Sequence, residues 1–117
     1  MPSGPTANPA ARGALWVLDY KTAPDALPVL VPMEGYPDSY DFHPHGMSLF
    51  VYDENHARMF VANERAAAST IEVLDLERSH EWRAQYVRTL QHPVGTHMPP
   101  ALHAGGPHAL YVSQAKR

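Results

Sequence analysis

The feature that most constrains the fold is a series of short apolar runs at roughly ten-residue spacing, separated by turn-forming residues. The chain has 12 prolines and 7 glycines, and many of them fall between the runs. In run 58–63, Met59, Val61 and Asn63 share one face of an extended strand, and Phe60 and Ala62 share the other. Strands of this kind predict an all-β sandwich, barrel or propeller. The predicted strands are 14–20, 27–31, 47–52, 58–63, 69–76, 85–90 and 109–113.

Two segments have some helical character but are predicted to be non-helical. Residues 64–68 are rich in alanine but too few to form a stable helix alone. Residues 76–88 carry several charges, and their apolar positions do not follow a 3.6-residue period, so a turn and a strand are predicted. The four strands between residues 47 and 90 would form a meander of about 45 residues, the size of one propeller blade.

Length, charge and composition limit the domain number, the partners and the chemistry of this chain. A chain of 117 residues fits one domain, and we expect a disordered segment at 1–12 and a folded domain at 13–117. A net charge of −3 and the lack of a basic patch argue against nucleic acid as a partner. No cysteine is present, which excludes disulfides and thiolate catalysis. We find neither the apolar core of a signal peptide nor a run of ~20 apolar residues, so no membrane span is expected and the compartment stays open.

The segment His43-Pro44-His45-Gly46 carries the most chemistry. Imidazole changes protonation near neutral pH and also binds metals. Pro44 restricts its own φ and pushes His43 toward an extended conformation, and Gly46 permits a bend or a close approach of the backbone. We therefore predict a turn that presents His45 where a loop enters a strand, a usual place for functional groups. Two hydrogen-bonded loop histidines with no function are the alternative.

Other polar groups give weaker indications. The turn Asp53-Glu54-Asn55 offers too few oxygen atoms for calcium, which takes 6–8 ligands. Ser48 and Ser69 lack the Gly-x-Ser-x-Gly context of a nucleophile elbow. Four further histidines have no spacing that predicts a zinc site, so we interpret them as surface residues: His92, His97, His103 and His108.

Several of these segments together resemble a known family. The block from Phe42 to Ser48, then Phe50, Asn63 and the stretch Ser-Thr-Ile-Glu-Val at 69–73, are similar to the paraoxonase/arylesterase family of six-bladed β-propeller lactonases. Residues 13–19 resemble the strand before this blade, and Gly106-Pro107 with Tyr111 resembles the start of the next blade. The resemblance covers about residues 12–114. It implies part of a six-bladed β-propeller, with one complete blade at 45–90 and strands of the two neighbouring blades.

The resemblance also implies a function, the calcium-dependent hydrolysis of a small ester or lactone by a carboxylic-ester hydrolase. His45 matches the family's active-site histidine, the base that activates water. Glu64 stands where the family often has a second histidine, and as a carboxylate it could accept a proton or orient His45. The backbone carbonyl of Met47 matches a main-chain ligand of the family's structural calcium.

Departures from the family pattern predict an incomplete or inactive version. An Asn-Asp pair that binds calcium in the family corresponds, in a gapless alignment, to Pro100 and Ala101, whose side chains cannot coordinate a cation. The acidic pair expected before the first strand of the blade is also missing.

Two other hypotheses stay open. A non-catalytic propeller fragment could act as an interaction module that self-associates through open strand edges. It would expose an apolar flank formed by Leu15, Val17, Leu110 and Val112. Alternatively, His43 and His45 could bind a transition metal, because residues two apart share a face of a regular strand.

Overall fold

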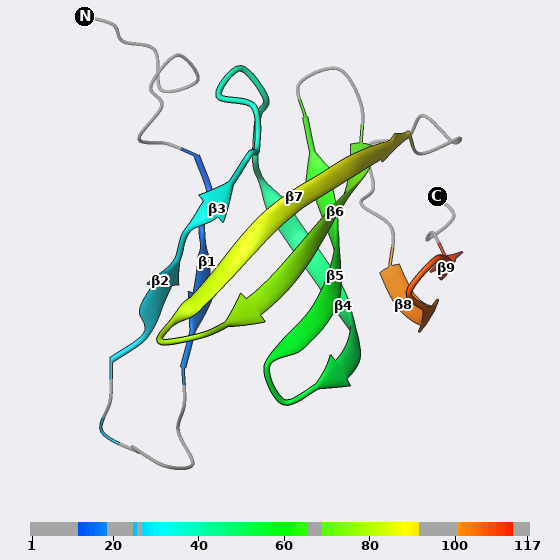
Figure 1. Ribbon diagram of the computed structural model, residues 1–117. Helices are drawn as coiled ribbons and strands as arrows, with labels where there is room; N and C mark the ends of the chain where they lie inside the picture. The colour runs from blue at the N-terminus through cyan, green and yellow to red at the C-terminus, as the bar shows by residue number, and fades with distance from the viewer. Residues whose placement is uncertain (1–11, 19–24, 26, 66–68, 92–100, 114–117) are drawn as a thin grey trace, which may run out of the picture.

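All regular structure in the described part of the chain is β-strand (Figure 1). The computed structural model describes residues 12–18, 25, 27–65, 69–91 and 101–113. Within these ranges no helix is present, which confirms the all-β prediction. The nine strands are β1 (Leu15–Val17), β2 (Val29–Val31), β3 (Met33–Glu34), β4 (Pro44–Asp53), β5 (His56–Glu64), β6 (Ser69–Arg78), β7 (Trp82–Gln91), β8 (Ala101–Gly106) and β9 (Ala109–Ser113).

The predicted meander is the core of the structure. Strands β4, β5, β6 and β7 pair with their sequence neighbours in antiparallel order, and β3 joins β7 in parallel, so the sheet order is β3-β7-β6-β5-β4. One four-stranded antiparallel unit of this kind is consistent with a blade of a β-propeller. Residues 1–11, most of the segment expected to be disordered, lie outside the described residues.

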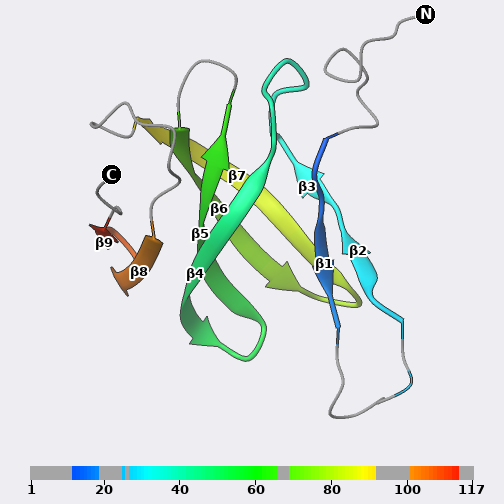
Figure 2. The ribbon, with the colours of Figure 1, turned by 180° about the vertical axis from the view of Figure 1, so that it is seen from behind.

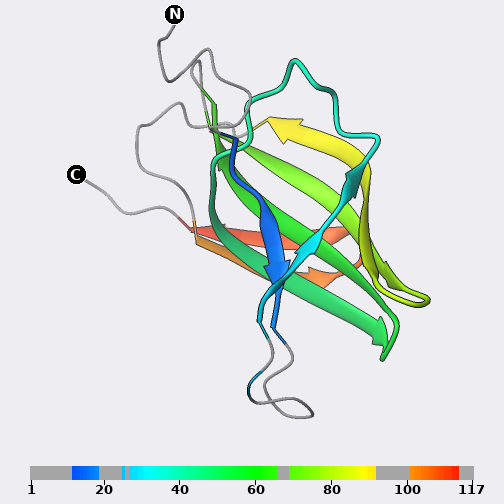
Figure 3. The ribbon, with the colours of Figure 1, turned by 90° about the vertical axis from the view of Figure 1, so that its left-hand side faces the viewer.

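Two small sheets cover the two faces of this central sheet. Figures 1 and 2 show the β1–β2 hairpin on one side and the β8–β9 hairpin on the other, and Figure 3 shows the same layers from the edge. Met59 and Val61 pack with the β1–β2 hairpin in one apolar cluster, which we call the first cluster. Phe60 and Ile71 pack toward the β8–β9 hairpin in the second cluster. Burial on both faces explains why the middle of β5, residues 59–62, is continuously apolar.

The segment His43–Gly46 is not the turn that we predicted. Strand β4 already begins at Pro44, where the missing N–H of proline is tolerated because β4 is an edge strand. A Cβ added at Gly46 would meet no atom within 4 Å, so this glycine permits no close approach. The close approach occurs at Gly13, where a Cβ would lie 2.6 Å from Cδ of Pro44.

The predicted apolar flank is also wrong for three of its four residues. Leu15 is buried in the first cluster and Val17 packs against it, while Leu110 packs against the second cluster. Only Val112 is exposed, at 43 %. Each small sheet turns one apolar face toward the central sheet. The exposed apolar side chains lie elsewhere on the small sheets and along β4. They include Trp16, Leu30, Met47, Leu49, Val51 and Tyr111.

No helix that is long and apolar enough to cross a membrane occurs in the part of the chain that the structure describes.

Candidate active site

A β-bulge at the start of β4 sets the position of His45. Pro44 pairs with Asn63 and Gly46 pairs with Ala62, so His45 is an extra residue in the ladder between β4 and β5. Bulges redirect side chains and occur often beside active sites. Here the bulge brings Nε2 of His45 to 2.9 Å from Oε1 of Glu64 at the end of β5. The two residues that the sequence paired by resemblance are therefore in direct contact.

The contact with Glu64 determines which nitrogen of a neutral His45 ring carries the hydrogen. The side chains of His45 and Glu64 are 42 % and 46 % exposed, so both reach solvent. A carboxylate can only accept a hydrogen bond, and Nε2 of the neutral imidazole must therefore carry the hydrogen. The lone pair is then on Nδ1, which is the atom able to take a proton from water.

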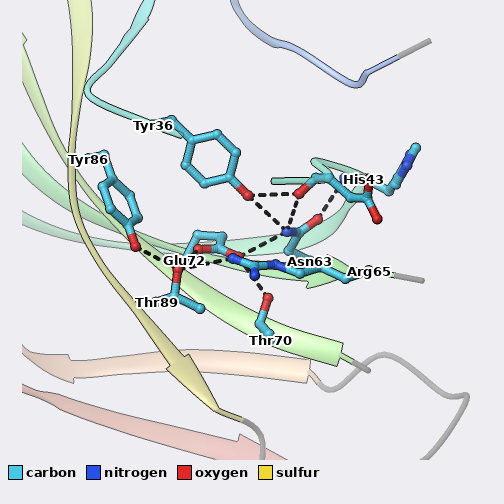
Figure 4. A network of polar contacts seen from close by, with 9 residues as sticks. Tyr36, His43, Asn63, Arg65, Thr70, Glu72, Tyr86 and Thr89 are labelled. Atoms are coloured by element: carbon cyan, nitrogen blue, oxygen red, sulfur yellow. Dashed lines mark hydrogen bonds and ion pairs between the residues drawn. The ribbon is translucent and has the colours of Figure 1, made fainter. Parts of the chain in front are cut away.

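A buried polar network includes Asn63, the residue before Glu64, and the backbone of His43 (Figure 4). Its centre is Glu72 on β6, whose side chain is fully buried. Oε2 of Glu72 accepts hydrogen bonds from the hydroxyl of Thr70 (2.7 Å), the amide of Asn63 (2.9 Å) and the guanidinium of Arg65 (3.0 Å). The hydroxyl of Thr89 donates to Oε1 of the same carboxylate. This buried carboxylate has four donors, one of which is a cation, and buried charges need such partners.

The network also sets the protonation of two of its members. Burial acts to raise the pKa of Glu72, but the hydrogen bonds from Thr89, Asn63 and Thr70 and the charge of Arg65 outweigh it and hold that pKa below its usual value. Burial and then the neighbouring charge of Glu72 raise the pKa of Tyr36 to about 12. Tyr36 therefore keeps its proton, which it donates to the carbonyl of Asp41 at 2.8 Å.

The described residues do not fit a calcium site. In the ranges that the structure covers, no three His, Cys, Asp or Glu side chains gather where they could hold a metal ion. Ala101 opens β8 with a methyl group, and Pro100, His92 and His97 lie outside the described residues. Met47 lies on β4, and the role of its carbonyl stays a prediction.

Comparison with known proteins identifies the family. The family model described as Arylesterase matches residues 1–116. This chain belongs to the arylesterase family. The match confirms the resemblance drawn from the His-Pro-His-Gly block and from the β6 sequence, and it supports a paraoxonase-like hydrolase at the family level. No curated protein matches the chain. The catalytic roles of His45 and Glu64 in this chain stay predictions.

Sequence reasoning missed the buried network. In β6, Thr70, Glu72 and Leu74 are two residues apart and so share one face of the strand, and all three are buried there. The available indication was Glu72 itself, a charged residue between Ile71 and Val73 in an apolar strand. Charged residues are almost never fully buried unless they are paired, so this position required a partner. Asn63, Arg65 and Thr89 come from other strands or their ends, and only the fold brings them to Glu72.

Proposed function

We propose that this arylesterase hydrolyses small esters or lactones, with His45 as the general base and Glu64 as the group that orients it. The observation that carries the proposal is the 2.9 Å contact between Nε2 of His45 and the carboxylate of Glu64 at a solvent-accessible end of the blade. In serine hydrolases a carboxylate likewise holds an imidazole in the tautomer that can act as a base.

The proposed step is the attack of water on the carbonyl carbon. Nδ1 of His45 takes one proton from the water as the new carbon–oxygen bond forms, and the electron pair of the C=O bond moves to its oxygen. Collapse of this tetrahedral species breaks the bond to the alcohol or phenol, and the imidazolium returns its proton to the leaving oxygen. General base catalysis of this kind contributes about 10²–10⁴-fold in rate.

Enzymes of this family typically depend on calcium. Because the described residues of this chain do not fit a calcium site, we assign no step to a metal. The expected rate enhancement is therefore only what a base and its orienting carboxylate supply. It does not include the charge stabilisation that a bound cation gives to a developing oxyanion.

We expect slow hydrolysis of phenyl acetate and of a γ-lactone that depends on His45. His45→Gln should lower the rate by about 10²–10⁴-fold, or to the uncatalysed rate, because the base is lost. Glu64→Gln should also lower it, because an amide can donate to Nε2 and so favour the tautomer with the hydrogen on Nδ1. Rates are measured with each purified variant in calcium and in excess chelator.

The matched control is His103→Gln, which removes an exposed imidazole of β8 and should leave the rate unchanged. We expect the chelator to have no effect. Equal rates for the wild type and His45→Gln would refute the role of His45. Chelator-sensitive turnover would show that residues outside the described ranges complete a calcium site.

Among the described strands none pairs with the outer edge of β4, and this edge favours a second candidate, an interaction module. β4 is the outermost strand of the central sheet, and Met47, Leu49 and Val51 along it are 53 %, 46 % and 61 % exposed. An edge strand with apolar side chains is a template for pairing with another chain. We therefore propose self-association through β4.

Sedimentation velocity at micromolar concentrations tests this candidate. We expect concentration-dependent oligomers for the wild type and a shift toward monomer for Leu49→Lys, because edge lysines oppose strand pairing. Glu77→Lys is the control, since the side chain of Glu77 is 66 % exposed on β6, and Glu77 has a strand partner on both sides. A compact wild-type monomer at every concentration would contradict self-association.

A further inference from the structure

We infer that Asn63 and Glu72 are positioning residues for His45. The carboxylate of Glu72 orients the amide of Asn63, the amide holds the backbone of His43, and this backbone sets where the bulge of β4 places His45. The catalytic meaning of the inference rests on the proposed function, but the arrangement itself can be tested without turnover.

The amide of Asn63 is surrounded by groups that permit one orientation. Oδ1 accepts the backbone N–H of His43 at 2.6 Å. Nδ2 lies 2.9 Å from Oε2 of Glu72, 2.9 Å from the carbonyl of Asp41 and 3.2 Å from the hydroxyl of Tyr36. Tyr36 uses its own hydrogen to bond the Asp41 carbonyl, so its oxygen also acts as an acceptor toward Asn63. Nδ2 thus faces only acceptors.

A rotation of the amide by half a turn would reverse every one of these contacts. Oδ1 would then face the carboxylate of Glu72, so that two acceptors would oppose each other. Nδ2 would face the N–H of His43, so that two donors would oppose each other. Asn63 is 1 % exposed and Glu72 is fully buried, and water cannot relieve such contacts there. The lowered pKa of Glu72 agrees with this, because the ionised carboxyl has no hydrogen to offer.

The held backbone leads directly to His45. The N–H of His43 donates to Asn63, and its carbonyl accepts the N–H of Glu64 at 3.2 Å. Pro44 has no N–H to add a bond, and His45 is the extra residue of the bulge. The two bonds at His43 therefore tie β4 to the end of β5 immediately before the bulge. They fix His45 relative to Glu64, the residue that follows Asn63.

An exchange of acid and amide gives a sharp test. Asn63→Asp keeps an acceptor for His43 but places a second carboxylate against Glu72. Glu72→Gln removes the charge that orients Asn63, with little change in side-chain size. The double variant combines the two substitutions. Its new carboxylate at position 63 accepts from His43, and its new amide at position 72 can donate to that carboxylate, which relieves the contact between two carboxylates in Asn63→Asp. The bond to the Asp41 carbonyl and the ion pair with Arg65 are not restored.

The experiment uses the full chain labelled with ¹⁵N. Amide hydrogen exchange reports on the His43 N–H, and the imidazole ¹⁵N shifts of His45 report which ring nitrogen carries the hydrogen. We expect each single variant to speed exchange at His43 by about tenfold, the effect of losing one hydrogen bond, and to shift the His45 signals. Compared with Asn63→Asp, the double variant should recover part of both changes, because only the contact between positions 63 and 72 is restored. Thr89→Val, which removes a donor to the other oxygen of Glu72, should leave both near wild type.

Each possible result either supports or contradicts the positioning role of Asn63 and Glu72. Partial recovery in the double variant, compared with Asn63→Asp, supports it, because the second substitution relieves only the contact between positions 63 and 72. If Asn63→Asp does not fold, Glu72→Gln and the double variant provide the same comparison. Unchanged His45 signals in folded single variants, or no recovery in a folded double variant, would overturn it. Neither readout needs hydrolysis, so an inactive chain would refute the proposed function and leave this result standing.

Discussion

Replacement of Glu72 by alanine is expected to destabilise the chain by about 3–5 kcal/mol. The substitution removes the common acceptor of Asn63, Arg65, Thr70 and Thr89. The guanidinium of Arg65, whose side chain is 20 % exposed, would keep its charge without the carboxylate. A loss of this size is a large part of the roughly 5–15 kcal/mol that stabilises a domain. Urea unfolding followed by circular dichroism measures it.

The matched control is Glu77→Ala on the same strand. The side chain of Glu77 is 66 % exposed, and its contact with His56 is long, at 3.6 Å. We expect a change within about 0.5 kcal/mol, as for most surface substitutions. Similar midpoints for Glu72→Ala and the wild type would contradict a stabilising role for the network.

The same carboxylate makes stability depend on pH in a defined direction. The pKa of Glu72 is lower in the folded chain than the ordinary value of about 4.3 expected in the unfolded chain. Its contribution is therefore complete above about pH 4.3 and is lost as the pH falls through the folded-state pKa. Glu72→Gln should give a flatter stability curve in this acid range, while Asp53, whose pKa is also lowered, contributes equally to both proteins.

Phe42→Ala is expected to cost about 3–5 kcal/mol, the usual range for a fully buried phenylalanine. Phe42 heads the set of largest fully buried side chains, with 0 % exposure, and belongs to the first cluster. Its ring meets the ring of Tyr36 edge to face, with centroids 5.5 Å apart. Removing it would leave a cavity directly before His43, and thermal unfolding together with urea unfolding measures the loss.

Phe50→Ala is the control for this prediction. Phe50 lies within β4 but is only partly buried, and its ring contacts Tyr52 at a centroid distance of 5.3 Å. A smaller cavity should form, so the loss should be clearly smaller than at Phe42. Equal losses at the two positions would show that burial at Phe42 is not what stabilises this region.

Most of the fold could be predicted because the strands of the meander have strong local patterns. β5 and β6 alternate as the sequence predicts, and their apolar residues divide between the two clusters. β8 was missed because its sequence, Ala-Leu-His-Ala-Gly-Gly, has low strand propensity. It becomes a strand by pairing with β9 and by packing against β4, where its Ala104 N–H bonds Oγ of Ser48 at 2.9 Å. Local propensity cannot predict contacts with a distant segment.

The candidate site, like the fold, could be predicted only in part from the sequence. The short apolar runs along the chain were enough to predict the all-β class. The residues at 42–48, 50, 63 and 69–73 carried the family resemblance, and this resemblance implied the pair His45 and Glu64. The folded chain was needed to show that His45 is a bulge residue instead of a turn residue, and that Asn63, Arg65 and Thr89 meet at Glu72. A register shift and a network between strands depend on which backbone groups face each other after the sheet has formed, and no local pattern specifies that.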